Sequence, residues 1–295
     1  MSIETKSKKN KKRSLLYDVW RRFRKNKTAM AGLVVIILLI IMAAFANVIA
    51  PGDGINPGDD IQDLSRAQQY PSRDHIMGTD NFGRDIFARI VHGSRISLQV
   101  GFVVVSISMV LGVMLGSIAG FYHKADNVIM RTIDILLAVP NILLAISIAA
   151  ALRPGLFSVM IAVGIGAIPS YARIVRASVL SLREQEFIEA ARSIGANDFR
   201  LILKHILPNC MAPIIVQATM GMASAILSAA GLSFIGLGIQ VPLPEWGAML
   251  AAGRPFIRTF YPMVLFPGVM IAVVIFSLNM LGDGLRDAFD PRLKK

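Results

Sequence analysis

Six long runs of mainly apolar residues constrain the fold more than any other feature of the sequence. They cover residues 29–50, 96–122, 132–152, 155–180, 209–237 and 261–281. Each is long enough for a helix to cross a hydrocarbon core of about 30 Å, which takes roughly 20 residues. A segment in lipid must also satisfy its own backbone hydrogen bonds. The chain is therefore expected to be an all-α integral membrane protein with six transmembrane helices.

The composition favours a membrane protein over a soluble one. Of the 295 residues, 54% are hydrophobic and 17% are charged, whereas soluble domains carry about 25% charged residues. The first apolar run is too long for the core of a signal peptide and lacks a convincing cleavage site, so a retained helix is expected. The single cysteine, Cys210, allows no disulfide within the chain.

Basic residues indicate the orientation of the chain. Residues 1–28 hold eleven Lys or Arg, residues 123–131 two, residues 173–204 six and the residues after Gly284 four, against eight in the connections on the other side. Cytoplasmic loops are enriched in Lys and Arg, so both termini are expected in the cytoplasm. The net charge of +12 is accordingly attributed to the membrane and not to nucleic acid, for which no motif is present.

The apolar runs divide the chain into five parts. Residues 1–28 are expected to form a basic, lipid-facing cytoplasmic tail, 29–50 the first transmembrane helix, 51–95 an extracytoplasmic segment, 96–284 a five-helix core, and 285–295 a cytoplasmic tail. Within the outer segment, residues 78–85 predict a turn, and residues 86–91 predict a short amphipathic helix at the membrane surface. A turn with a packed helix is favoured there over a substrate site.

One polar, helix-forming stretch, residues 184–208, lies between two apolar runs and is called the polar loop below. Residues 186–194 predict a short helix, Gly195 a break, and residues 197–207 a second short helix that ends before Pro208. Two short helices that protrude from the membrane and meet at a bend are suited to binding another protein.

The sequence carries no recognisable catalytic or metal-binding pattern. It contains no phosphate-binding Gly-rich loop, its four histidines are scattered, and no nucleophile is paired with a base and an orienting acid. The centres of the six runs hold no Asp, Glu, Lys or His, which ion-driven carriers generally need. Non-catalytic transport powered by another chain is therefore favoured over an ion-coupled secondary transporter. It is also favoured over a scaffold, in which the polar loop would have no purpose.

Uncharged polar residues do occur within the apolar runs. Asn141, Gln217, Ser224 and Asn279 are candidates for lining a hydrophilic passage. Hydrogen bonding between helices is the alternative role and is favoured for any single residue, because small residues such as Gly221 allow helices to pack closely.

The polar loop also carries a motif of fixed spacing. Glu189, Ala190 and Ala191 are followed after three residues by Gly195, and the loop ends on Ile206, Leu207 and Pro208. This pattern resembles the signature of the inner-membrane permeases of bacterial ABC importers. That signature ends I-x-L-P, and His205 here takes the place of its isoleucine. The ending His-Ile-Leu-Pro-Asn is similar to the peptide and nickel branch of the family.

Further stretches extend the resemblance along almost the whole chain. They are Gly78-Thr-Asp with Gly83-Arg84-Asp85, Arg95-Ile-Ser-Leu, Met130-Arg131 with Asp134, Pro244-Glu245-Trp246-Gly247, and Gly282-Asp283-Gly284-Leu285-Arg286-Asp287 with Asp290-Pro291. All of them look like the second, or C-type, permease subunit of dipeptide and oligopeptide importers.

The resemblance implies a type I ABC importer permease fold in the bacterial inner membrane. The implied partners are a homologous second permease in a heterodimer, two ATPase subunits and an extracytoplasmic peptide-binding protein. ATP and Mg would be bound by the ATPase subunits, with no cofactor in this chain. The implied docking residues for the ATPase are Glu189, Ala190, Ala191, Gly195, Ile206, Leu207 and Pro208. The implied cargo is a dipeptide or oligopeptide, with nickel or glutathione as alternatives.

Overall fold

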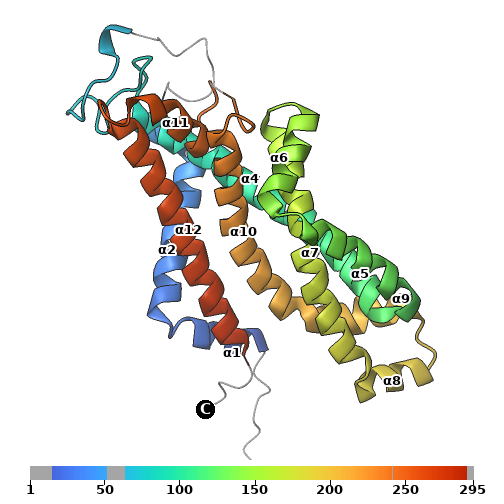
Figure 1. The fold of residues 1–295 in the computed structure, drawn as a ribbon. Coiled ribbons are helices and arrows are strands. Elements are labelled where there is room, and N and C mark those ends of the chain that lie inside the picture. Colours follow the sequence, from blue (N-terminus) through green and yellow to red (C-terminus); the bar gives the residue numbers. More distant parts are fainter. Residues whose placement is uncertain (1–14, 52–63, 241, 291–295) are drawn as a thin grey trace, which may run out of the picture.

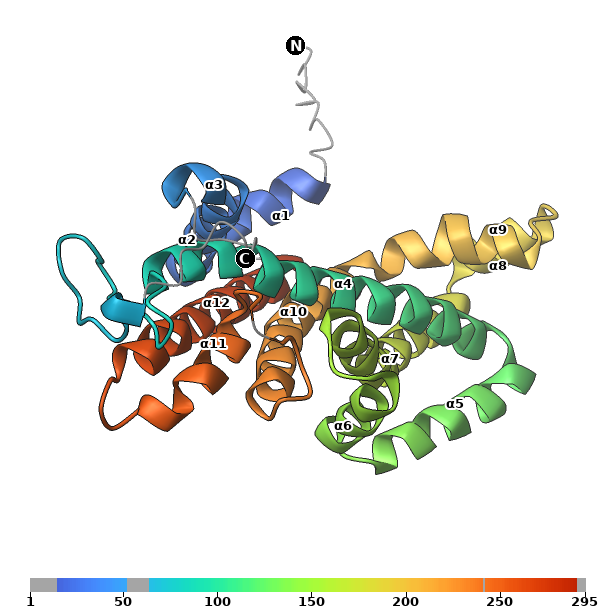
Figure 2. The same ribbon diagram turned by 90° about the horizontal axis from the view of Figure 1, so that it is seen from above.

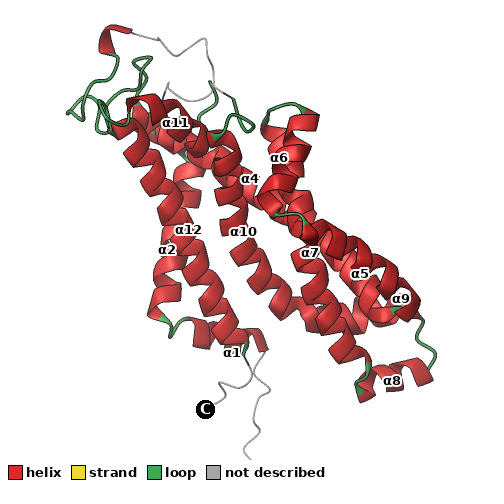
Figure 3. Ribbon diagram, in the orientation of Figure 1, coloured by secondary structure: helices red, strands yellow, loops and turns green. Residues whose placement is uncertain are grey.

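The computed structural model describes residues 15–51, 64–240 and 242–290, and almost all of these residues are helical, with no strand among them (Figure 3). Five helices in the described part are long and apolar enough to cross a membrane, or six if one pair bent by 90° counts as a single span. The prediction of an all-α membrane protein is confirmed, and the bent pair is the candidate for the predicted sixth crossing.

The long elements follow the predicted apolar runs. They are α2 (Lys27–Ala44), α4 (Ile86–Phe121), α7 (Leu156–Arg183), α10 (Met211–Phe234) and α12 (Pro262–Phe289), with the bent pair α5 (His123–Ala138) and α6 (Asn141–Leu152). The shorter elements are α1 (Leu15–Phe23), α3 (Ala46–Ile49), η1 (Leu64–Arg66), α8 (Glu186–Ser193), α9 (Asp198–Arg200), η2 (Leu201–Ile206), η3 (Leu207–Cys210), α11 (Trp246–Gly253) and η4 (Arg254–Phe256).

The helices form two packed groups (Figures 1 and 2). In one group α2 lies against α12, and in the other α7 lies against α4 and α6. α10 contacts α4, α7 and α12, and so joins the groups. Glycines at positions 112, 116 and 120 face α7, and a Cβ atom at any of them would overlap atoms of that helix. Small residues four positions apart therefore allow α4 and α7 to pack backbone to backbone.

The two ends of the molecule hold different parts of the chain. α1, the end of α12 and α8 lie at one end, called the inner end below, and η1 and α11 lie at the other, the outer end (Figure 1). Arg22 Nη1 donates a hydrogen bond to the carbonyl oxygen of Asp290 at 3.2 Å. The first and last described helices thus meet at the inner end, as an even number of crossings requires.

Two predicted connections are helical in the structure. Residues 86–91 do not form a separate surface helix but begin α4, which runs for 36 residues and crosses Figure 1 obliquely. The helix continues through the polar residues 92–95 into the next apolar run. Ile86, Ile90 and Val91 are buried under neighbouring helices. Residues 123–131, expected as a short connection, belong to α5. That helix ends before Pro140, because a residue that precedes proline disfavours helical geometry.

Candidate functional site

A cavity of about 340 Å³ lies between the start of α6, the middle of α7 and the middle of α10. The predicted passage residues Asn141, on α6, and Gln217 and Ser224, both on α10, all line it. Ser170, Tyr171 and Ser228 add hydroxyl groups, and none of the lining residues is charged. Such a wall offers hydrogen bonds without a fixed charge, so it can accommodate a polar solute without holding it tightly.

The fourth predicted passage residue lies elsewhere. Asn279 is a half-buried residue of α12, and no residue of α12 lines the cavity. All four candidates are uncharged polar residues within apolar runs, and only the packing of the helices separates them. The structure therefore brings three of the four together.

Tyr171 is a cavity residue that sequence reasoning missed. Its side chain is 2% exposed, and its hydroxyl donates to the backbone oxygen of Gln217 at 3.4 Å. A Cβ atom at Gly221 would overlap the Tyr171 hydroxyl, and one at Gly112 would overlap the Tyr171 Cβ atom. Tyr171 thus fixes the distance between α7 and α10 at the cavity. A tyrosine within an apolar run was the available signal.

The polar loop has the predicted bend. Gly195 follows α8 with a φ of +87°, a left-handed conformation that glycine adopts without strain. The backbone N–H of Ala196 donates to Ala191 O at 3.1 Å and closes the end of the helix. The Asn197 side chain then accepts the N–H of Arg200 at 2.9 Å and caps the next helical segment.

The predicted docking residues divide between two faces of the loop. Glu189, Ala190, Gly195 and Pro208 are exposed, and Leu207 is half-buried. Ala191 and Ile206 are 6% and 0% exposed, and both pack in a cluster with Val175 and Val179 of α7 and Ile214 of α10. The second group therefore attaches the loop to α7 and α10, while the first faces outward.

The second helix of the loop does not end before Pro208. The helical path continues from α9 through the π-helix η2 and the 3₁₀-helix η3 into α10. Proline has no N–H to donate to the preceding turn. Asn209 Nδ2 donates instead to the carbonyl oxygen of His205 at 2.6 Å. This side-chain bond explains how the helix passes through proline, which the sequence alone suggested as a stop.

Glu189 lines a polar cleft of about 390 Å³ beside α8. Arg183, Glu184, Arg192 and Phe121 form the rest of its wall. Arg183 Nη1 donates to Gly120 O at 3.0 Å, and the Arg192 guanidinium lies 5.9 Å from the Phe121 ring centre. The two arginines thereby connect the cleft to the end of α4.

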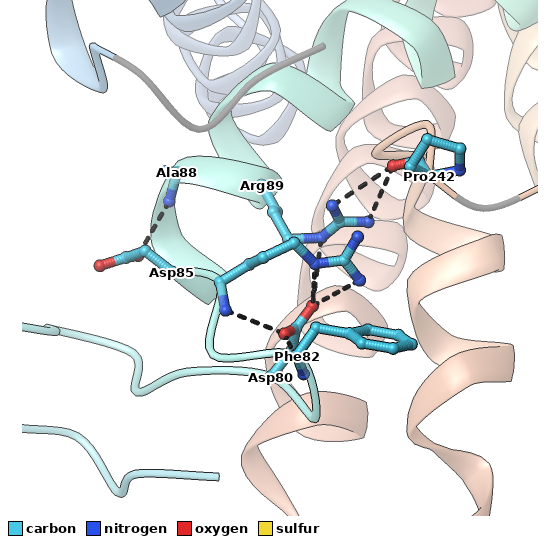
Figure 4. Close-up of polar contacts among 7 residues, drawn as sticks. Asp80, Phe82, Asp85, Ala88, Arg89 and Pro242 are labelled. Carbon is cyan, nitrogen blue, oxygen red and sulfur yellow. Dashed lines mark hydrogen bonds and ion pairs between the residues drawn. The ribbon is translucent and has the colours of Figure 1, made fainter. Parts of the chain in front are cut away.

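The predicted turn at residues 78–85 is held by buried charges at the outer end (Figure 4). The Asp80 carboxylate accepts the N–H groups of Phe82 and Arg84 at 2.8 and 3.0 Å, and Arg84 Nε at 2.7 Å. Arg89, on α4, lies 3.7 Å from the same carboxylate, and its guanidinium donates to Pro242 O at 3.3 Å. These contacts attach the turn to α4 and to the segment that leads into α11.

The Pro244–Gly247 motif is also structural. The Glu245 carboxylate accepts the N–H groups of Gly247 and Ala248, both at 2.8 Å, and caps α11. Burial raises the pKa of Glu245, while these N–H groups and the Ser233 side chain oppose the shift. Trp246 is fully buried and donates its indole N–H to Ile90 O at 3.1 Å.

Metal-binding geometry does not occur in the described ranges. Among residues 15–51, 64–240 and 242–290, no three His, Cys, Asp or Glu side chains lie close enough together to hold a metal ion.

Comparison with known proteins gives the chain a family. Residues 112–295 match the family described as the inner membrane component of binding-protein-dependent transport systems, and residues 14–71 match the N-terminal transmembrane domain of oligopeptide transport permease C. The dipeptide transport system permease protein DppC of Alkalihalophilus pseudofirmus is 49% identical over 280 residues, which cover 94% of this chain and 90% of that protein. The glutathione transport system permease protein GsiD of Pectobacterium atrosepticum is 44% identical, with 94% and 91% covered.

A solved structure supports the fold independently of close sequence similarity. An inward-facing conformation of the MetNI methionine ABC transporter matches with a TM-score of 0.57 at 20% identity, over 68% of this chain and 97% of that chain. The chain therefore has the fold of an ABC importer permease and belongs to the family of inner membrane components of binding-protein-dependent transport systems.

Proposed function

We propose that this chain is the C-type permease subunit of an ATP-driven importer that carries dipeptides or oligopeptides across the bacterial cytoplasmic membrane. The observation that carries this proposal is the connection between the cavity and the polar loop. α7 and α10 both line the cavity, and both pack against the buried side of the loop through the cluster that contains Ala191 and Ile206.

The connection gives a mechanism for coupling. An ATPase that binds the exposed residues Glu189, Ala190 and Gly195 would move α8 when it closes on nucleotide. Because the loop is packed on α7 and α10, this movement passes as a rigid-body shift to two walls of the cavity. Pro208 and Leu207 lie where the loop joins α10, so they belong to the same moving unit.

The other components of the importer follow from the relatives. A homologous permease would complete the passage as a heterodimer, and an extracytoplasmic binding protein would deliver the peptide at the outer end. Two ATPase subunits would bind ATP and Mg and hydrolyse the nucleotide. This chain would then act as a non-catalytic subunit with no cofactor of its own, like the relatives that are named as transport permeases.

The peptide assignment rests on the relatives and on the cavity. Relatives that are 49% and 44% identical are named for dipeptide and for di- and tripeptide transport. A lining of amide and hydroxyl groups suits the repeating amides of a peptide backbone, whatever its side chains. Glutathione is the second candidate, because GsiD proteins match at 44–45% identity.

Uptake measurements test the proposal directly. Cells that lack only this chain would be supplied with a labelled dipeptide, a longer peptide, glutathione or nickel, with and without the restored gene. We expect peptide uptake that requires ATP and persists when the proton gradient is collapsed. Rescue of glutathione or nickel alone would overturn the peptide assignment, and uptake driven by the proton gradient would overturn the coupling mechanism.

The variant Glu189→Lys tests coupling to the ATPase without altering the cavity. It reverses a charge on the exposed face of the loop without touching the cavity. We expect uptake to fall at least about tenfold while the amount of chain in the membrane stays constant, since a charged contact is worth about 1.5–3 kcal/mol. Normal uptake by this variant would show that Glu189 does not contact the ATPase.

A further inference from the structure

α1 has one face that belongs to the protein core. Phe23 is 3% exposed and packs with Ala29 and Ala288, and Val19 packs against the same cluster. A Cβ atom at Gly284 would overlap that of Ala29. The start of α2, the end of α12 and α1 are therefore tightly packed at the inner end.

The opposite face of α1 and the turn after it carry basic side chains. Arg21, Arg24, Lys25 and Lys27 are exposed, and none of their side chains forms an ion pair or hydrogen bond within the described residues. Arg22 differs, because it donates to Asp290 O. Four cations thus face away from the helices.

Acidic groups at this end do not neutralise the surface. Asp18 lies in the first turn of α1, and Asp287 lies 3.4 Å from the Asn26 amide. The inner end of α12 adds the carboxylates of Asp283 and Asp290 and the guanidinium of Arg286. The described residues of this end therefore carry four carboxylates against six cations, so the surface stays basic. Six more Lys or Arg occur at positions 6–13, in the sequence that precedes the described residues.

Aromatic side chains accompany the basic ones. Tyr17 and Trp20 are 54% and 50% exposed, and the Trp20 ring stacks on Phe23 with centroids 5.9 Å apart. Tyrosine and tryptophan favour the depth of the lipid headgroups, where one part of the ring is in an apolar environment and the other is hydrated. Their place directly before a transmembrane span is the position at which such rings meet lipid headgroups.

The position of α1 matches that depth. The helix ends at Phe23, Asn26 caps α2 by accepting the N–H of Ala29 at 3.2 Å, and α2 then enters the apolar region. α1 lies across the inner ends of α2 and α12 and does not extend either of them (Figures 1 and 2). An amphipathic helix at the end of a span, with basic and aromatic side chains exposed, has the properties of an interfacial helix.

We propose that α1 and the turn to Lys27 form a binding surface for anionic phospholipid headgroups of the cytoplasmic leaflet. The four exposed cations bind the headgroup phosphates, and Tyr17 and Trp20 lie among the headgroups. Each basic side chain near an anionic membrane surface raises affinity by about fivefold. Because α1 packs on the ends of α2 and α12, bound lipid also stabilises their junction.

Quenching of tryptophan fluorescence tests this surface. The probes are brominated phosphatidylglycerol and brominated phosphatidylcholine, titrated into detergent micelles of the full-length chain. The chain has two tryptophans, and Trp246 is fully buried. Subtracting the signal of the variant Trp20→Phe isolates the contribution of Trp20. We expect phosphatidylglycerol to quench Trp20 at a concentration at least about tenfold lower than phosphatidylcholine, and salt to reduce the difference.

Matched charge removals decide the result. The variant Arg21→Gln/Arg24→Gln/Lys25→Gln should lose most of the preference for phosphatidylglycerol. The control Arg73→Gln/Arg153→Gln/Arg258→Gln removes three positive charges from exposed arginines elsewhere in the chain. This control should keep the preference for phosphatidylglycerol. Equal quenching by the two lipids in the unmodified chain, or an unchanged preference in the α1 variant, would overturn the proposal. Displacement of the quencher by a short RNA at equimolar concentration would also overturn it.

Discussion

The outer and inner ends of the molecule use charged residues in opposite ways. At the outer end Asp80, Arg84 and Arg89 are 5%, 4% and 4% exposed and bind one another. At the inner end Glu189 and Arg192 are exposed and line an open cleft. A buried charge must have its partners within the chain, whereas an exposed one remains available to another subunit. The outer end is thus fixed by its own contacts, and the inner end is left open for binding.

The largest expected effect comes from removing the central carboxylate of the outer end. Asp80→Ala removes the carboxylate that Arg84 and Arg89 share in a buried site, and breaking a buried ion pair in this way costs about 3–5 kcal/mol. We expect little folded protein in the membrane and a much lower melting temperature in detergent. Asp74→Ala removes an exposed carboxylate from the same segment and should leave both unchanged. Equal stability of the two variants would show that the buried cluster does not hold the outer end.

At the inner end a substitution should impair transport and spare the fold. Gly195→Val forces a β-branched residue into a φ of +87°, with a strain of about 1–3 kcal/mol, in a place with open space around it. We expect uptake to be lost while the amount of chain in the membrane, measured by immunoblotting, stays normal. The control Gly231→Ala also has open space, but no left-handed φ, and should transport normally. Normal uptake with Gly195→Val would show that the bend is dispensable.

In the cavity between the two ends, the contact between Gly221 and Tyr171 should affect both stability and uptake. Gly221→Ala places a methyl group against the Tyr171 hydroxyl, and overpacking of this kind costs about 1–3 kcal/mol. Adding Tyr171→Phe removes the hydroxyl and should recover part of the melting temperature and of the uptake. Strictly additive effects of the two substitutions in a double-mutant cycle would contradict direct contact between these residues.

The smallest expected effect concerns two ion pairs in the inner half of the molecule, which differ in how exposed they are. Arg176 binds Asp126 through two hydrogen bonds of 2.5 and 2.6 Å, whereas the pair Arg173 and Asp134 is 52% and 58% exposed. Exposed ion pairs contribute about 0–1 kcal/mol. Thermal unfolding should therefore change little with Asp134→Asn and more with Asp126→Asn. The reverse order would show that exposure does not decide the strength of these pairs.

Local patterns predicted the polar loop well, because its geometry depends on neighbouring residues. Gly195 and Asn197 form the bend and the cap through contacts within a few positions. The start of α4 could not be predicted in the same way. Its outer turns look like part of a hydrated segment, and only packing beneath Trp246 and the residues near it shows that they are buried.

The contacts among the residues that line the cavity were also beyond prediction from local sequence. Tyr171 and Gly221 are separated by 50 positions, and nothing in either neighbourhood predicts that they touch. Asn279 differs from Asn141 only in the helix that carries it, since α12 lies outside the lining and α6 contributes to it. The kind of residue could be predicted from the sequence, whereas its neighbours depend on the packing of distant segments.

The length of α4 makes bilayer thickness a mechanical variable for this protein. Its 36 residues extend about 54 Å at 1.5 Å per residue, well beyond a hydrocarbon core of about 30 Å. A rod of this length accommodates a thinner or thicker membrane by changing its slant. Because α4 and α7 pack closely at Gly112, Gly116 and Gly120, we expect a change in the acyl-chain length of the host lipid to tilt both helices together, and α7 is one wall of the cavity.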